Sequence, residues 1–308
     1  MLRYILILLI TACAAQAEIR YTQADLDRVR ERAVPDIKAV FYEDIIGRLP
    51  RAQQARARQV KLTFPEAGRS PLDFYADPST QTISMPLTSI RFFDDMAVLY
   101  SWFESKGCRA ENIQSYLLAT LRQGRTMPTP LRAFNIDRQT AFSDPFAGDV
   151  SGKIYSSGLQ FILAHELGHL LLDHRTDVNA AGSQRQEVEA DAFALEHFAR
   201  LGGNPMGVFW YYMTAWWYDP QEAARRAAST HPVSPERINA LAARLLREPM
   251  DFAHGEENPQ REAVFVRQIA GMAGTLAGFV EENGMLNFMI ATLHDEFPVE
   301  GFGEACPS

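Results

Sequence analysis

Cysteine, positive charge and long apolar runs are all scarce in this chain of 308 residues. Three cysteines are too few for a small scaffold held together by disulfide bonds. Thirty Lys and Arg against 38 Asp and Glu give a net charge of −8, so the chain has no general attraction for nucleic acid or anionic lipid. After the first 17 residues, the longest apolar runs (206–218 and 269–280) are shorter than a membrane-spanning helix. The ordinary hydrophobic content predicts one globular unit with a substantial core.

The first 17 residues predict an export signal. Arg3 precedes an apolar run, and residues 15–17 read Ala-Gln-Ala, a small-x-small cleavage site. Residues 10–13, Ile-Thr-Ala-Cys, also resemble a lipoprotein cleavage box, in which Cys13 would carry a lipid anchor. Both routes export the chain, and we expect residues 18–308 to form a single domain that is periplasmic or secreted.

Export changes the interpretation of the two remaining cysteines. Cys108 and Cys306 would form an even pair in an oxidising compartment once Cys13 is removed or acylated. A disulfide between them would tie the C-terminal tail to the middle of the domain. The alternative is two buried free thiols, and both interpretations stay open.

Patterns along the chain predict a mainly helical protein with one short β hairpin. Residues 20–60 read as helical, with a basic stretch at 51–58 interpreted as a solvated helix face. The hairpin is expected at 72–85, and residues 125–155, rich in Pro, Gly, Asp and Ser, are expected to form a long irregular loop. Further helices are expected at 88–106, 111–123, 156–174, 185–201, 205–218, 234–247 and 259–283.

His165, Glu166 and His169 form a His-Glu-x-x-His motif inside an apolar helical run. Side chains four positions apart on a helix differ by about 40° in direction, so both imidazoles reach one metal ion from one face. Glu166 lies about 100° around the helix, where it could take a proton from a metal-bound water, whose pKa zinc lowers to about 7. Without a metal, such a buried cluster would be costly to desolvate. The motif therefore predicts a catalytic zinc site.

A catalytic zinc site needs a third protein ligand. His174 follows His169 by five positions, so on a continuous helix it would point about 140° away from it. We therefore expect His174 at the surface or at the end of the helix. The metzincin pattern is excluded because it requires Gly at position 172 and His at position 175, where this chain has Leu172 and Arg175.

The next helical segment offers a better third ligand. Its apolar positions between 190 and 201 define a buried stripe, and Glu187 and Asp191 lie on the same side. Glu187 as the third zinc ligand, and Asp191 as the acceptor for a ligand imidazole N–H, would satisfy both carboxylates. The alternative is a helix end at which both carboxylates are solvated.

The spacing of these motifs is similar to that of a known class. His165-Glu166-x-x-His169 followed by Glu187-x-x-x-Asp191 is the gluzincin arrangement. Residues 189–194 and the Thr-His-Pro-x-x-x-Glu-Arg-Ile segment at 230–238 resemble the CAAX prenyl protease/HtpX family. Two features depart from that family. Only 17 residues separate His169 from Glu187, and the family's membrane helices are missing. A soluble exported branch, or a neighbouring gluzincin family, fits as well.

The resemblance implies a zincin-like metallopeptidase fold with one Zn²⁺. It implies His165, His169 and Glu187 as ligands, Glu166 as general base, and His231 near the metal on the substrate side. From its own position, before Pro232 and the next helix, His231 could donate a hydrogen bond to an oxyanion or occupy the zinc in a resting state.

Two other segments have simpler interpretations. Arg237, one turn into the helix that follows His231, could anchor that loop through Asp191. Residues 209–218 hold three of the four tryptophans, and their helical spacing predicts core packing. The alternative for this segment is an apolar wall of a substrate cleft, or a patch that meets a partner or a membrane.

The sequence thus predicts an exported zinc metalloendopeptidase that acts on peptide or protein substrates. The alternative is a chaperone-like or binding protein of the cell envelope with a closed or vestigial zinc site, which His231 permanently on the zinc would produce. The presence of Glu166 favours the enzyme, because a purely structural zinc site does not need a base beside the metal.

Overall fold

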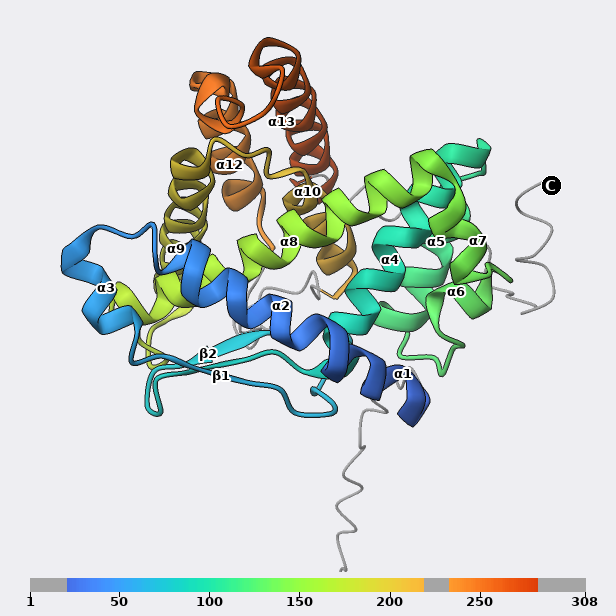
Figure 1. Cartoon of the computed structure of the whole chain (residues 1–308), viewed down its shortest axis with the longest axis horizontal. Coiled ribbons are helices and arrows are strands. Elements are labelled where there is room, and N and C mark those ends of the chain that lie inside the picture. The colour runs from blue at the N-terminus through green and yellow to red at the C-terminus, as the bar shows by residue number, and fades with distance from the viewer. Residues whose placement is uncertain (1–20, 219–232, 282–308) are drawn as a thin grey trace, which may run out of the picture.

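The computed structural model describes residues 21–218 and 233–281, and these residues form a mainly helical fold with one small sheet, as predicted (Figure 1). The longer helices are α4 (Leu87–Lys106), α8 (Pro145–Leu171), α9 (Ala180–Leu201), α12 (Pro235–Arg247) and α13 (Pro259–Glu281). The shorter ones are α1 (Gln23–Arg28), α2 (Val34–Ala39), α3 (Arg51–Ala57), α5 (Glu111–Leu117), α6 (Pro130–Ala133), α7 (Arg138–Ser143) and α10 (Met206–Ala215). The export signal predicted at residues 1–17, Cys13, His231 and Cys306 lie outside the described residues.

The N-terminal part of the structure is one nearly continuous helix. It begins at a capping box, in which the side chains of Thr22 and Asp25 each accept a hydrogen bond from the backbone N–H of the other residue. Two π-helical segments, η1 (Val29–Ala33) and η2 (Val40–Ile45), join α1 and α2 into the same rod. The last turns of the rod bury Phe41 and Ile45, and η2 contacts α8. The helical prediction for this region is therefore confirmed.

The sheet has the strand order β1-β3-β2. Strands β2 (Tyr75–Asp77) and β3 (Thr82–Ser84) pair antiparallel and confirm the predicted hairpin. Strand β1 (Lys61–Thr63) pairs parallel to β3 and was not predicted. Its pairing joins segments about twenty residues apart, which a local pattern does not reveal.

The prediction of an irregular loop over 125–155 is wrong. This segment contains α6, α7 and the first part of α8. Asp144 caps α8 by accepting hydrogen bonds from the backbone N–H groups of Phe146 (3.1 Å) and Ala147 (2.9 Å), and Pro145 occupies the first helical position. The Pro and Asp residues of this segment mark the starts of helices, because Asp favours the N-cap position and Pro favours the first helical position.

Helix α8 crosses the molecule between α5–α7 at one end and α9 at the other, and it contacts α4, α9 and α10 (Figure 1). Glycines allow the close packing on two sides of it. A Cβ atom at Gly158 would lie 2.3 Å from the ring of Phe93 on α4. A Cβ atom at Gly207, on α10, would lie 2.2 Å from the carbonyl oxygen of Ile154. Helix α8 is therefore held from both sides along its middle.

The tryptophan-rich segment forms α10 and the short 3₁₀ segment η4 (Trp216–Tyr218). Phe209, Tyr212, Trp216 and Trp217 are all buried in the core. The prediction of core packing for this segment is therefore confirmed.

The C-terminal part of the structure is formed by α12, the short η5 (Pro249–Phe252) and α13, which contact one another (Figure 1). Among the described helices, one segment of α13 (Pro259–Val280) is long and apolar enough to cross a membrane by length and composition alone. The predicted run at 269–280 is only part of this longer segment. Ala270 and Ala273 on its buried face pack in the core, and α13 also contacts α10.

Candidate metal centre

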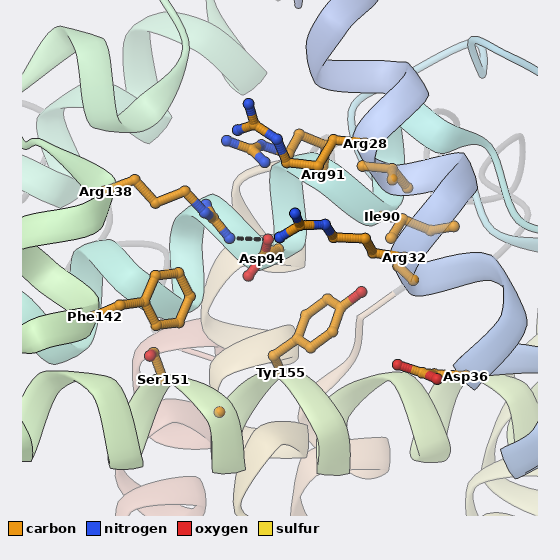
Figure 2. A pocket seen from close by; sticks show the side chains of 13 residues that line it. Arg28, Arg32, Asp36, Ile90, Arg91, Asp94, Arg138, Phe142, Ser151 and Tyr155 are labelled. Atoms are coloured by element: carbon orange, nitrogen blue, oxygen red, sulfur yellow. Dashed lines mark hydrogen bonds and ion pairs between the residues drawn. The ribbon is translucent and has the colours of Figure 1, made fainter.

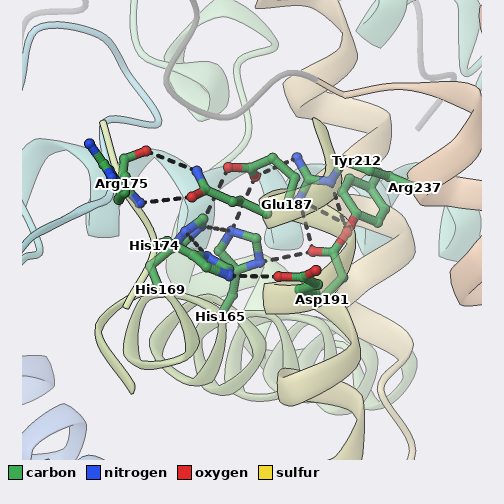
Figure 3. A network of polar contacts seen from close by, with 10 residues as sticks. His165, His169, His174, Arg175, Glu187, Asp191, Tyr212 and Arg237 are labelled. Carbon is green, nitrogen blue, oxygen red and sulfur yellow. Dashed lines mark hydrogen bonds and ion pairs between the residues drawn. The ribbon is translucent and has the colours of Figure 1, made fainter. Parts of the chain in front are cut away.

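Four helices bring a group of buried polar and charged residues together around the middle of the fold. Helix α8 supplies His165, Glu166 and His169, and α9 supplies Glu187 and Asp191. Helix α12 adds Arg237, and α10 adds Tyr212. Each of these seven side chains is less than a tenth exposed. Figure 3 shows the two imidazoles turned toward Glu187, with Asp191, Tyr212 and Arg237 grouped to one side of them, on the right of the view.

The donor atoms of His165, His169 and Glu187 converge on one point. The two Nε2 atoms lie 3.0 Å apart. Glu187 places Oε2 3.3 Å from Nε2 of His165, and Oε1 3.4 Å from Nε2 of His169. Ligands at 2.0–2.2 Å from a tetrahedral zinc ion lie roughly 3.3 Å from one another. The three side chains therefore form a buried group that could hold a metal ion.

Asp191 orients the first of these imidazoles. Its Oδ1 lies 2.8 Å from Nδ1 of His165, the ring nitrogen that faces away from the donor cluster. With the proton on Nδ1, the lone pair of Nε2 is free to face a metal ion. Burial alone would lower the pKa of His165, but hydrogen bonds to Asp191 and Glu187 outweigh it and raise the pKa to about 10 in the metal-free protein.

Arg237 neutralises part of the buried negative charge. Its guanidinium donates to Asp191 from Nε (2.8 Å) and Nη2 (2.8 Å), and its Nη1 lies 3.0 Å from Oε2 of Glu187. The hydroxyl of Tyr212 also donates to Asp191 (2.7 Å). Burial would raise the pKa of Asp191, but Arg237 and His165 hold it well below its usual range, so this carboxylate stays charged.

His174 lies within this network at the end of α8, which confirms the expectation of a helix-end position, whereas the alternative of a surface position is wrong. Helix α8 ends before it, and Asp173 takes a left-handed conformation with φ of 58°, which turns the chain back. His174 is buried, and its Nδ1 lies 2.8 Å from Nδ1 of His169. Its Nε2 lies 3.1 Å from Oε2 of Glu189. His169 thus has an outer partner, as His165 has in Asp191.

The end of α8 is held by a residue from a distant segment. Arg56 on α3 donates to the carbonyl oxygens of Leu170 (2.5 Å) and Leu171 (3.1 Å), and it pairs with Asp173. The basic stretch at 51–58 was predicted to be a solvated helix face. Arg51 and Arg58 are exposed as predicted, and the side chain of Arg56 is 40% exposed, but its guanidinium also caps the helix that carries the two histidines, which was not predicted.

Two of the predicted site features involve residues outside the described ranges. His231 is one, so its place near the metal stays a prediction. Cys108 is disulfide-bonded. Both other cysteines, Cys13 and Cys306, lie outside the described residues, so the pairing of Cys108 with Cys306 also stays a prediction.

The fold and the site together define a mainly helical protein with a buried His-His-Glu group able to hold a metal ion. Residues 109–256 match the model of the family described as Peptidase U49, and this match supports a peptidase. The matched range contains α8, α9, α10 and α12, which carry the seven residues of the site. The resemblance to the CAAX prenyl protease/HtpX family is not confirmed. No curated protein and no solved structure matches the chain.

Proposed function

We propose that this chain is a zinc-dependent endopeptidase of the gluzincin type, with His165, His169 and Glu187 as the metal ligands. The observation that carries the proposal is the convergence of their donor atoms within 4.8 Å of one another in a buried position. Two imidazoles and one glutamate form a ligand set of catalytic zinc sites, which keep a further position open for water or substrate.

The buried charges also favour a divalent cation. Glu166, Glu187 and Asp191 are all buried, and Arg237 is the cation that the structure places among them. Burying three carboxylates in a region of low dielectric is costly, and a divalent cation held by Glu187 and the two imidazoles would lower that cost. In the metal-free protein, hydrogen bonds to Asp191 and Glu187 favour a protonated His165 instead.

The chain's own residues account for the proton transfers. A bound zinc ion would polarise the substrate carbonyl and make a water acidic enough to react near neutral pH. Glu166 takes a proton from that water as its oxygen bonds to the carbonyl carbon, and it passes the proton to the leaving amine as the C–N bond breaks. Asp191 and His174 keep the two imidazoles oriented, and Arg237 keeps Asp191 and Glu187 in place.

Metal content and hydrolysis of the full chain test this proposal separately. We expect about one zinc per chain in the wild type and in Glu166→Gln, and little in Glu187→Ala, because only the last variant removes a ligand. Glu196→Ala is the matched control, since Glu196 is an exposed glutamate on the same helix. Zinc content is measured by mass spectrometry after dialysis against zinc and then against buffer.

Hydrolysis is measured on a mixed peptide library by mass spectrometry. Glu166→Gln should lose activity by about 10²–10⁴-fold, which is the usual contribution of a general base. Wild-type activity in Glu166→Gln would contradict the mechanism. A wild type that takes up no zinc would contradict the metal site itself.

A further inference from the structure

A cavity lies on the opposite part of α8 from the histidines, between η1, α4, α7 and the first half of α8 (Figure 2). Its volume is about 310 Å³. Tyr155, on its wall, precedes His165 by ten residues on the same helix, which is about 15 Å along the helix axis. The cavity is therefore separate from the candidate metal centre.

Four arginines line this cavity: Arg28, Arg32, Arg91 and Arg138. Figure 2 shows their guanidinium groups turned toward a common space above the rings of Phe142 and Tyr155. The carboxylates among the lining residues are Asp36 and Asp94. Asp95, directly behind the lining, pairs with Arg91 and Arg138, so four arginines meet three carboxylates here, although the whole chain has a net charge of −8.

The two inner arginines are fixed by carboxylates. Arg91 is buried, and its Nε lies 3.1 Å from Oδ1 of Asp95. Arg138 pairs with Asp94, and its Nη1 lies 2.5 Å from Oδ1 of Asp95. The hydroxyl of Tyr21 donates to the other oxygen of Asp95 (3.1 Å). These contacts hold both inner guanidinium groups in a fixed orientation and leave the outer pair, Arg28 and Arg32, to meet a ligand.

The two outer arginines have no such partner. Arg28 and Arg32 are exposed, and neither forms an ion pair with a carboxylate in residues 21–218 or 233–281. They are four positions apart, and like charges at this spacing on a helix repel each other. An anion placed between them would remove that repulsion.

We propose that this cavity binds a small phosphate monoester, with the phosphate held by Arg28 and Arg32 and the organic part against Phe142 and Tyr155. Guanidinium groups match phosphate oxygens in paired hydrogen bonds. A phosphate monoester carries a charge of about −1.5 to −2 at neutral pH, which matches the two outer guanidinium groups that would hold it better than one carboxylate does. The cavity is at the lower end of the size range of small-molecule sites and has room for more than a phosphate group.

Isothermal titration calorimetry on the full chain tests the assignment, with inorganic phosphate, phenyl phosphate and benzoate as probes. We expect phenyl phosphate to bind at least tenfold more tightly than benzoate, and more tightly than inorganic phosphate because only the ester reaches the apolar wall. Arg28→Gln/Arg32→Gln should weaken phenyl phosphate binding at least tenfold. Arg58→Gln/Arg247→Gln is the matched control, because it removes two exposed arginines away from the cavity.

A second pair of variants at one position tests the same site without removing a charge. Gly152 lines the cavity, and a Cβ atom there would meet nothing within 4 Å, so the backbone tolerates a side chain. Gly152→Glu should abolish phenyl phosphate binding by placing a carboxylate among the arginines, whereas Gly152→Ala should retain it. Circular dichroism of each variant confirms that the fold is kept.

Three results would overturn the proposal. One is a wild type that binds neither phosphate probe. Another is equal phenyl phosphate affinity in the wild type and in the folded Arg28→Gln/Arg32→Gln variant. The third is tighter binding of benzoate than of phenyl phosphate, which would assign the cavity to carboxylates.

Discussion

Arg237 is the residue on which the buried carboxylates of the metal centre depend. Its side chain is about 1% exposed and contacts Asp191 and Glu187. Burying a charged pair is itself of little benefit to stability, but removing one partner leaves an uncompensated charge in the core. The residue is therefore a structural requirement of the site, whatever its part in catalysis.

We predict that Arg237→Gln lowers the free energy of unfolding of the metal-free protein by about 3–5 kcal/mol. Asp191→Asn should also destabilise it, because Arg237 then loses its main partner. The double variant should lose less than the two single losses added together, since the charges disappear as a pair. Urea unfolding after treatment with a chelator measures all three values. Strict additivity would show that the two side chains are not energetically coupled.

His197 makes the stability of the fold sensitive to acid. It is 0% exposed, and neither of its ring nitrogens has a hydrogen-bond partner in the described residues. Burial, together with the charges of Arg200 and Arg48, lowers its pKa to about 4. Because this pKa lies below the ordinary value of 6.5, the unfolded chain binds a proton first as the pH falls. The stabilising contribution of the neutral His197 side chain is therefore complete above pH 6.5 and is lost as the pH falls toward 4.

We predict that His197→Leu loses less stability than the wild type between pH 7 and pH 4.5. The difference should reach about 2–3 kcal/mol, since one pKa unit corresponds to 1.36 kcal/mol. Urea unfolding of both proteins at the two pH values measures it. The same pH dependence in both proteins would mean that His197 is solvated or protonated in the folded state.

At the scale of elements, the packing of α8 against α10 depends on a glycine contact. A Cβ atom at Gly207 would lie 2.2 Å from the carbonyl oxygen of Ile154, a backbone atom that has little freedom to move. Gly152 lies on α8 itself, five residues after Ala147. A Cβ atom at Gly152 would meet nothing within 4 Å. The two glycines therefore differ in what an alanine would meet.

We predict that Gly207→Ala lowers the free energy of unfolding by about 1–3 kcal/mol through overpacking. Gly152→Ala should instead raise it by about 0.5–1 kcal/mol, because alanine is favoured over glycine inside a helix. Thermal or urea unfolding of the two variants gives the comparison. Equal effects at the two positions would mean that α10 adjusts to the added methyl group without cost.

Local patterns predicted the elements whose signals lie within the segment itself. Gly107 takes a positive φ of 63° and ends α4 where its position in the sequence predicts a stop. The apolar stripe in the sequence of α9 predicted that Glu187 and Asp191 lie on its buried side. Both residues are buried in the structure. Features that depend on distant partners were missed. The turn at Asp173, which brings His174 onto His169, is held by Arg56, more than a hundred residues earlier in the chain.

At the scale of the whole molecule, the site depends on segments that precede the matched family range. That range begins at residue 109, whereas α8 packs against α4, η2 and the sheet, which all lie before it. Phe93 on α4 fills the space beside Gly158 of α8. Helix α13, after the range, covers α12 and α10. The family range is therefore not a self-contained core.

We predict that a fragment of residues 109–256 does not form the metal centre on its own. Without α4 and α13 it would expose the apolar faces of α8, α10 and α12, which cannot stay in water at their native spacing. The fragment should show no cooperative thermal transition and bind no stoichiometric zinc, whereas the full chain should show both if the proposed metal site is correct. Differential scanning calorimetry and metal analysis compare the two proteins. A fragment that unfolds cooperatively and binds zinc would place the determinants of the site within the family range alone, and the N-terminal helices would then need a different role, such as formation of the arginine-lined cavity.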